Sequence, residues 1–196
     1  MVIQYFGMGM VKVSLGEEVL AFAPIGKGGS MKGPSFGSNV ALVPLREVNY
    51  NGVENVTYGA KQPFVIDGPG EYEVNSTFIK GIGDGANTIY SVVFDDIRLA
   101  HLGVFTGSAI KAEMKEALGE VDILFVPPSA YKLYLALDAK IIIPLYCASN
   151  NPSGDILKQF LKEAGEEGVK AIDKLVIKKK ELEGKGGEII VIKSWE

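Results

Sequence analysis

The sequence predicts a protein of the α/β (α+β) class, in which two β-sheets pack against each other and helices lie outside them. Three observations predict it. The first half of the chain consists mainly of short apolar or alternating runs, which are typical of strands. The second half alternates between such runs and segments whose apolar residues recur at helical spacing. Clusters of glycine separate the runs, as expected for loops between short strands.

The first half contains eight predicted strands, which are residues 3–6, 10–14, 19–23, 40–43, 53–58, 64–66, 72–74 and 77–82. A loop rich in glycine, proline and lysine fills residues 24–37. The run 40–43 is wholly apolar, which indicates a strand buried on both faces. A hairpin follows, with strands at 88–94 and 97–102, because the adjacent Asp95 and Asp96 suit a tight turn.

The second half contains three predicted helices, at residues 108–118, 129–137 and 152–164. Ser108 can cap the first of them, and Met114 and Leu118 share one of its faces. Further strands are predicted at residues 122–126, 140–144, 175–178 and 188–193. We expect one domain over residues 1–196, with the first sheet built mainly from 1–80 and the second mainly from 88–192.

Composition excludes several classes of protein. The net charge of −4 gives no basic surface of the kind that nucleic acid requires, so we expect no nucleic-acid partner. No apolar run approaches the ~20 residues of a membrane span, and residues 1–15 do not read as a signal peptide. The single cysteine, Cys147, excludes an intrachain disulfide and fits a reducing compartment. We therefore expect a cytoplasmic protein with no membrane partner.

Residues 62–74 read Gln-Pro-Phe-Val-Ile-Asp-Gly-Pro-Gly-Glu-Tyr-Glu-Val, and this run resembles a segment of the metallo-β-lactamase fold superfamily. The similarity is to the small branch of predicted metal-dependent hydrolases similar to ascorbate-6-phosphate lactonase. Other segments resemble that branch in matching order, namely residues 5–8, 31–36, 39–43, 87–90, 98–103, 121–127 and 140–144. The resemblance implies a four-layer αββα sandwich.

The resemblance also implies where metal ligands should stand. Family members bind metal with a run of the form H-x-H-x-D-H and with later Asp and His ligands. Glu47 is the only carboxylate left at these positions, Asn49 and Tyr50 are poor ligands, and Leu45 and Val104 offer no donor. The full set of positions is Leu45, Glu47, Asn49, Tyr50, Val104 and Tyr146. Zinc and similar ions need several imidazole and carboxylate donors. With one histidine in the whole chain, we expect no metal and no other cofactor.

His101 and Cys147 are the remaining side chains that could take part in catalysis. His101 is interpreted as a structural histidine at the end of a strand. Cys147 and His101 could form a nucleophile pair, since both follow strands that converge in the resembling fold. A lone cysteine is more often buried and inert, so this is the less favoured reading.

We therefore predict a non-catalytic member of the fold, a pseudoenzyme with a binding or assembly role. The alternatives are a metal-dependent hydrolase or lactonase of the same family and a metal-free enzyme that uses Cys147 and His101. The former metal site is either a pocket for an unknown small molecule or protein, or a cleft that has filled in. We also expect a homo-oligomer, with apolar segments such as Phe36, Phe105 and 131–137 as possible contacts.

Overall fold

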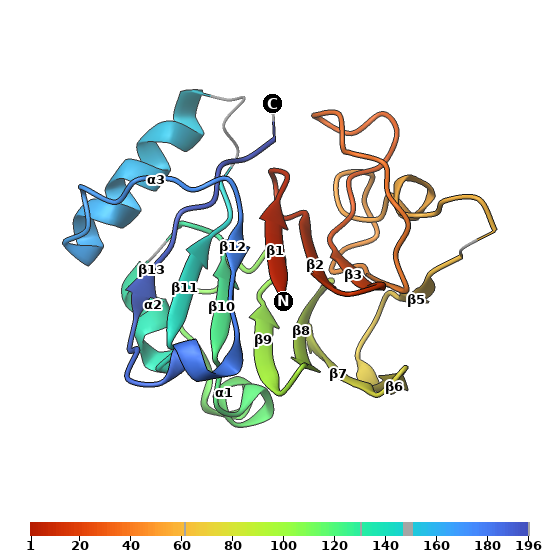
Figure 1. Cartoon of the computed structure of the whole chain (residues 1–196). Helices are drawn as coiled ribbons and strands as arrows, with labels where there is room; N and C mark the ends of the chain where they lie inside the picture. Colours follow the sequence, from red (N-terminus) through yellow and green to blue (C-terminus); the bar gives the residue numbers. More distant parts are fainter. Residues whose placement is uncertain (61, 130, 147–150, 196) are drawn as a thin grey trace.

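The computed structural model describes residues 1–60, 62–129, 131–146 and 151–195, and it contains two mixed β-sheets packed face to face (Figure 1). The first sheet has the strand order β12-β1-β2-β3-β4-β5. Its members are β1 (Val2–Tyr5), β2 (Val11–Leu15), β3 (Glu18–Phe22), β4 (Val40–Leu42), β5 (Phe64–Ile66) and β12 (Leu175–Val176). Strands β3, β4 and β5 run parallel to one another, so their carboxyl ends meet at one edge.

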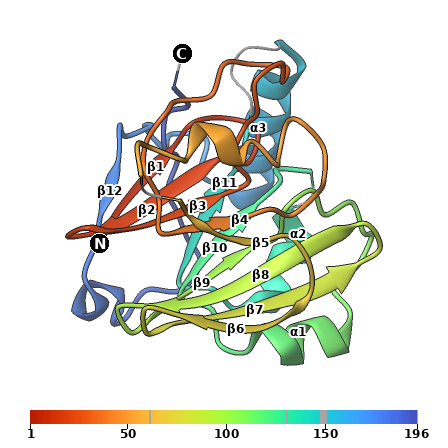
Figure 2. The ribbon, with the colours of Figure 1, turned by 90° about the vertical axis from the view of Figure 1, so that its right-hand side faces the viewer.

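The second sheet has the order β13-β11-β10-β9-β8-β7-β6. Its members are β6 (Gly70–Val74), β7 (Thr77–Asp84), β8 (Asn87–Phe94), β9 (Ile97–His101), β10 (Ile123–Val126), β11 (Ile141–Pro144) and β13 (Glu188–Ile189). Strands β9, β10, β11 and β13 are parallel, whereas β6 to β9 form an antiparallel meander, seen from its own side in Figure 2.

The predicted sandwich is confirmed, and its layers follow from three apolar clusters. The main core lies between the sheets and includes Phe22 from the first and Phe125 from the second. A second cluster lies between the second sheet and the helices α1 (Ala112–Leu118), α2 (Tyr131–Tyr134) and α3 (Asn151–Ala164). A third, smaller cluster covers the outside of the first sheet with loop residues such as Ile25 and Val56. One turn of 3-10 helix, η1 (Val53–Asn55), belongs to this outer layer.

Two predicted assignments are wrong. Residues 53–58 do not form a strand, because the chain turns at η1 and the buried Asn55 amide donates to the Ile25 carbonyl at 2.7 Å. The first predicted helix begins at Ala112 rather than at 108, and Lys111 is its N-cap residue. The other two helices are confirmed, with η2 (Leu135–Leu137) completing the second of them.

The division of the chain between the sheets also differs from the prediction. Strands β6 and β7 belong to the second sheet, because tight hairpins join them in series with β8 and β9. Asn75 and Ser76 have φ angles of 49° and 61°, and Asp95 and Asp96 have 55° and 58°, as two-residue hairpin turns require. Strand β12 instead returns to the first sheet, where Val176 pairs with Val2.

One tyrosine ties the two sheets together at the edge where the strands end. Tyr90 is fully buried on β8, and its hydroxyl donates to the Val43 carbonyl at 2.8 Å, just beyond β4. The carbonyl of Ile66 on β5 lies 2.9 Å from the same oxygen. Burial raises the pKa of Tyr90, so the hydroxyl keeps its proton and remains a donor.

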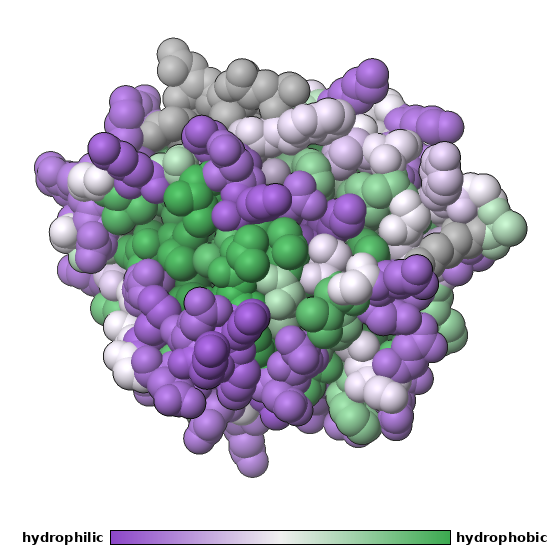
Figure 3. Space-filling view, viewed as in Figure 1, coloured by the Kyte–Doolittle hydropathy of each residue, from purple (hydrophilic) through white to green (hydrophobic). Residues whose placement is uncertain are grey.

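The surface seen in Figure 1 carries an apolar band over β11, β12 and β1, with hydrophilic side chains above and below it (Figure 3). Val176 on β12 is 60% exposed and the nearby Ile172 is 38% exposed. Within the described residues, no helix combines the length and the hydrophobicity needed to cross a membrane.

Candidate functional site

A cavity of about 500 Å³ opens beside the carboxyl ends of β4 and β5, and we call it the edge cavity. Leu45 and Glu47 line it from the loop after β4, while Asp67 follows β5. The hairpin between β7 and β8 closes the other side with Gly83, Gly85, Ala86, Asn87 and Thr88. An exposed ion pair between Arg46 and Asp67, 3.0 Å long, crosses its rim.

Val104 lies close to this cavity, because it is hydrogen-bonded to the buried Asn87, which lines the cavity. The Asn87 Oδ1 accepts from the Val104 amide at 3.1 Å, and its Nδ2 donates to the Leu102 carbonyl at 3.1 Å. Gly103 between them has φ 62°, and a Cβ there would stand 2.2 Å from Asn87 Oδ1 and 2.8 Å from Pro44 Cβ. The close approach requires glycine, and it brings the loop after β9 against the loop that carries Leu45.

His101 ends β9 inside the protein and has no exposed surface. Its Nδ1 accepts from the Gly103 amide at 3.0 Å, so Nε2 carries the proton and donates to the Gly9 carbonyl at 2.9 Å. The ring stacks on Phe22 at 5.3 Å. Burial lowers the pKa of His101 to about 4, against a smaller opposing effect of the Gly9 bond. Both ring nitrogens are therefore occupied, and the imidazole is neutral near pH 7.

Asn49 and Tyr50 face a different part of the same edge. The Asn49 Oδ1 accepts from the Ser30 amide at 2.7 Å, and its Nδ2 donates to the Ser30 hydroxyl at 3.1 Å. Asn49 thus fixes the glycine-rich loop that begins after β3. Tyr50 and His101 both approach Gly9, where a Cβ would lie 3.7 Å from Tyr50 Cε1 and 3.9 Å from His101 Cε1.

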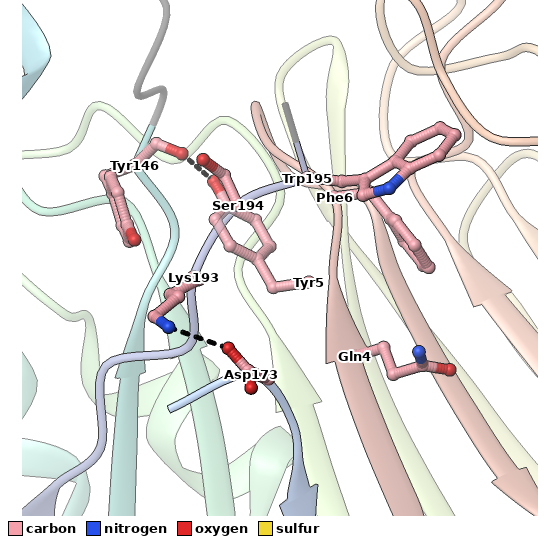
Figure 4. A pocket seen from close by; sticks show the side chains of 8 residues that line it. All are labelled: Gln4, Tyr5, Phe6, Tyr146, Asp173, Lys193, Ser194 and Trp195. Carbon is pink, nitrogen blue, oxygen red and sulfur yellow. Dashed lines mark hydrogen bonds and ion pairs between the residues drawn. The ribbon is translucent and has the colours of Figure 1, made fainter. Parts of the chain in front are cut away.

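Tyr146 lines a second cavity, of about 530 Å³, which we call the groove (Figure 4). It follows β11, its ring lies 5.6 Å from that of Tyr5 on β1, and its hydroxyl donates to the Ile192 carbonyl at 3.0 Å. Tyr5 in turn donates its hydroxyl proton to the Tyr146 carbonyl. Burial raises the pKa of Tyr146.

The six predicted site residues are thus divided over three places. Leu45 and Glu47 line the edge cavity and Val104 is bound to its wall, Asn49 and Tyr50 support neighbouring loops, and Tyr146 faces the groove. That these positions once formed a metal site stays a prediction. Cys147 lies outside the described residues.

The residues at this edge do not fit a pair of catalytic metal ions. Glu47 and Asp67 supply two carboxylates, but Asp67 is already paired with Arg46. Leu45 and Val104 supply no donor, and the nitrogens of His101 are both engaged. In the described part of the chain, no three His, Cys, Asp or Glu side chains are grouped closely enough to hold an ion.

Sequence reasoning missed the groove residues Gln4, Asp173, Lys193 and Trp195. They lie near the two ends of the chain and belong to no motif. The only signal was that Trp195 is the single tryptophan.

Comparisons with known proteins agree with this architecture. Residues 41–145 match the profile of the beta-lactamase superfamily domain. The search of curated proteins gave no match. A crystal structure of a candidate Zn-dependent hydrolase of the metallo-beta-lactamase superfamily from Thermotoga maritima is 24% identical, with a TM-score of 0.78 and 98% of each chain covered.

More distant structures share the fold as well. A candidate metal-dependent hydrolase from Parabacteroides distasonis is 14% identical, with a TM-score of 0.62, and the alignment covers 98% of this chain and 93% of that one. A metallo hydrolase from the archaeon Ignicoccus hospitalis is 13% identical, with a TM-score of 0.60 and coverages of 90% and 99%. At these identities the likeness establishes the fold alone.

Proposed function

The chain belongs to the beta-lactamase superfamily, and from this premise we propose that it is a non-catalytic member with a binding or assembly role. Hydrolysis in the metal-dependent members of such a fold needs a metal to polarise the substrate and to activate a water molecule. This chain keeps the scaffold but offers two carboxylates and no free imidazole at the edge where the strands end. The single cysteine fits a cytoplasmic location.

The state of His101 carries the proposal. A histidine that binds metal or abstracts a proton needs a nitrogen lone pair directed at the ligand or substrate. In His101 the Nδ1 lone pair accepts from Gly103 and the Nε2 proton is given to Gly9. The ring also lies beneath the surface between Phe22 and Phe125. The only histidine of the chain therefore acts as a packing residue.

We expect the purified protein to hold no stoichiometric zinc, manganese or iron. Elemental analysis after dialysis against metal-free buffer measures this directly. The same samples, with each ion added back, are then assayed on a phosphodiester, a carboxylic ester and a lactone. As a control, the melting temperature is measured with each added ion before and after treatment with a chelator, and we expect it not to change. One equivalent of bound metal together with metal-dependent turnover would overturn the proposal.

A hydrolase or lactonase is the second candidate, favoured by the hydrolase names of the structural neighbours. The metal experiment decides between the two. A metal-free enzyme based on Cys147 and His101 is the third. It requires His101 to act as a base, which conflicts with its two hydrogen bonds and its lowered pKa. Loss of an activity after thiol alkylation would revive it.

For assembly, we propose that a second copy of the chain covers the apolar band at β12. One earlier candidate, Phe105, is unsuitable because it is 3% exposed, and in the segment 131–137 Tyr134 is fully buried whereas Leu135 is 47% exposed. The band instead exposes Val176 and Ile172. Strand β12 is an edge strand of the first sheet, and an exposed apolar edge is a surface that a second copy can cover through a two-fold contact.

We expect Val176→Glu to shift the protein toward the monomer, because a carboxylate at the centre of a buried apolar contact is costly. Light scattering coupled to size-exclusion chromatography measures the mass of both proteins. Val65→Glu is the matched control, since Val65 is 43% exposed on β5, the opposite edge of the same sheet. A wild-type protein that is monomeric at high concentration would contradict the assembly proposal.

A further inference from the structure

The groove has the size and wall chemistry of a small-molecule site. Its volume of about 530 Å³ falls in the usual range for such sites, roughly 300–1,000 Å³. Figure 4 shows Tyr146 on one side and Trp195 with Phe6 on the other. The indole of Trp195 meets the Phe6 ring edge-on, with centroids 6.1 Å apart and an interplanar angle of 87°. Trp195 is 51% exposed, so the contact with Phe6 holds the indole while much of its surface stays accessible.

The charges at the groove cancel. Lys193 and Asp173 are the charged side chains of its lining, and they form an ion pair of 2.8 Å. The pairing raises the pKa of Lys193 and lowers that of Asp173, so both remain ionised near neutral pH. A phosphate or a carboxylate ligand would find no net positive charge here. The wall chemistry therefore favours a neutral ligand.

Uncharged polar groups complete the lining. The side-chain amide of Gln4 has both a donor and an acceptor, and it makes no hydrogen bond to another described residue. Ser194 adds a hydroxyl, and Asp173 has a second carboxylate oxygen, Oδ2, beyond the Oδ1 that Lys193 occupies. Groups that both donate and accept suit a ligand with several hydroxyls.

We propose that the groove binds a neutral saccharide, with a pyranose ring lying against Trp195 or Tyr146 and its hydroxyls bonded to Gln4 and Asp173. The apolar C–H face of a sugar ring fits an aromatic surface, and its hydroxyls fit mixed donors and acceptors. A nucleoside base could also stack on the aromatic side chains, but it would leave most of the polar groups of the groove without a hydrogen-bond partner. The proposal deepens the binding role proposed above and rests on it.

The single tryptophan supplies the experiment. Because Trp195 is the single tryptophan and lines the groove, its fluorescence reports on this site and on the adjoining cavity at loop residues 26–35, and Gln4→Ala, which lies in the groove only, distinguishes the two. Neutral monosaccharides and their methyl glycosides are titrated against the full chain, with adenosine and glucose 6-phosphate as competing classes. We expect a saturable change in emission with at least one neutral sugar, reproduced by calorimetry. No saturable change with any neutral sugar, or tighter binding of adenosine, would overturn the proposal.

Two variants test the wall chemistry. We expect Gln4→Ala to weaken sugar binding about tenfold, the usual effect of losing one well-formed hydrogen bond. Gln159→Ala is the matched control, since Gln159 is exposed on α3 and outside the groove lining. Asp173→Asn leaves Lys193 uncompensated, so the preference should move toward the sugar phosphate. Equal affinity in wild type and Gln4→Ala, or an unchanged preference in Asp173→Asn, counts against the site.

The outcomes separate this proposal from the general function. If the protein lacks metal and turnover but no sugar binds, the saccharide proposal fails and the non-catalytic role stands. If metal and hydrolysis are found, the non-catalytic role fails whatever the titration shows.

Discussion

Protonation of His101 is by itself expected to lower the free energy of unfolding by about 3 kcal/mol as the pH falls from 6.5 to 4. The folded protein holds the ring neutral until its pKa of about 4, whereas the unfolded chain takes up the proton near the ordinary value of 6.5. The unfolded state therefore binds more protons between these two values. The stabilisation is complete above pH 6.5, falls as the pH drops, and is lost below pH 4.

Urea unfolding at pH 7 and pH 5 measures this effect, and we expect a loss of about 2 kcal/mol between them from His101. Carboxylates begin to titrate at the lower pH, so the control is His101→Gln, which keeps a donor and an acceptor but cannot be protonated. The variant should be less stable at pH 7 and should show a smaller loss on acidification.

A second measurement covers the case in which His101→Gln does not fold. The chain has one histidine, so a single pair of imidazole signals follows its titration by NMR. A pKa near 4 is expected. A pKa near 6.5 would show that the ring reaches solvent, and it would remove the observation on which the non-catalytic role depends.

The sequence predicted those elements whose structure is decided locally. The hairpin at Asp95 and Asp96 formed because both residues tolerate the positive φ that a two-residue turn needs. The apolar run at 40–43 became β4, in which every residue is buried, since only burial on both faces suits such a run. The predicted strand at 53–58 failed because Asn55 hydrogen-bonds the distant Ile25 carbonyl, a contact that no local pattern reveals.

The same distinction applies to the candidate site. Leu45 and Val104 follow strands whose carboxyl ends meet, so chain topology was enough to bring their loops together. Tyr146 also follows such a strand, but its side chain faces the groove with Tyr5 instead. The groove itself could not be predicted, because Gln4 and Trp195 come from opposite ends of the chain and meet only through tertiary packing.

Replacing Asp122 by alanine is expected to destabilise the protein by about 2 kcal/mol, although Asp122 belongs to neither cavity of the candidate site. Asp122 is 6% exposed and precedes β10. Its Oδ2 accepts from the Arg98 amide at 2.9 Å, where β9 passes. Lys140 beside β11 donates to Oδ1 at 2.7 Å, and Lys179 in the 3-10 turn η3 (Lys179–Leu182) donates to Oδ2 at 2.7 Å. One carboxylate thus joins three segments that are distant in sequence.

Burial by itself would raise the pKa of Asp122, but the bonds from Lys140, Lys179 and the Arg98 amide outweigh it and hold the pKa below the ordinary value. Its contribution to stability is therefore present above the unfolded pKa near 3.8 and is lost as the pH falls through the lower folded value. Both lysines are partly exposed, so water can solvate their ammonium groups when Asp122 is removed. The stability lost in Asp122→Ala is therefore smaller than that lost on breaking a fully buried ion pair.

Chemical unfolding at pH 7 compares three variants. Asp122→Asn keeps an acceptor for the Arg98 amide, so it should recover part of the loss seen in Asp122→Ala and isolate the contribution of the charge. Asp155→Ala is the matched control, because Asp155 is 81% exposed on helix α3 and its ion pair with Lys158 is 3.8 Å long. That pair should contribute less than about 0.5 kcal/mol. If Asp122→Ala were as stable as Asp155→Ala, the three bonds to Asp122 would contribute no net stability, and packing alone would hold β9, β10 and β11 in register.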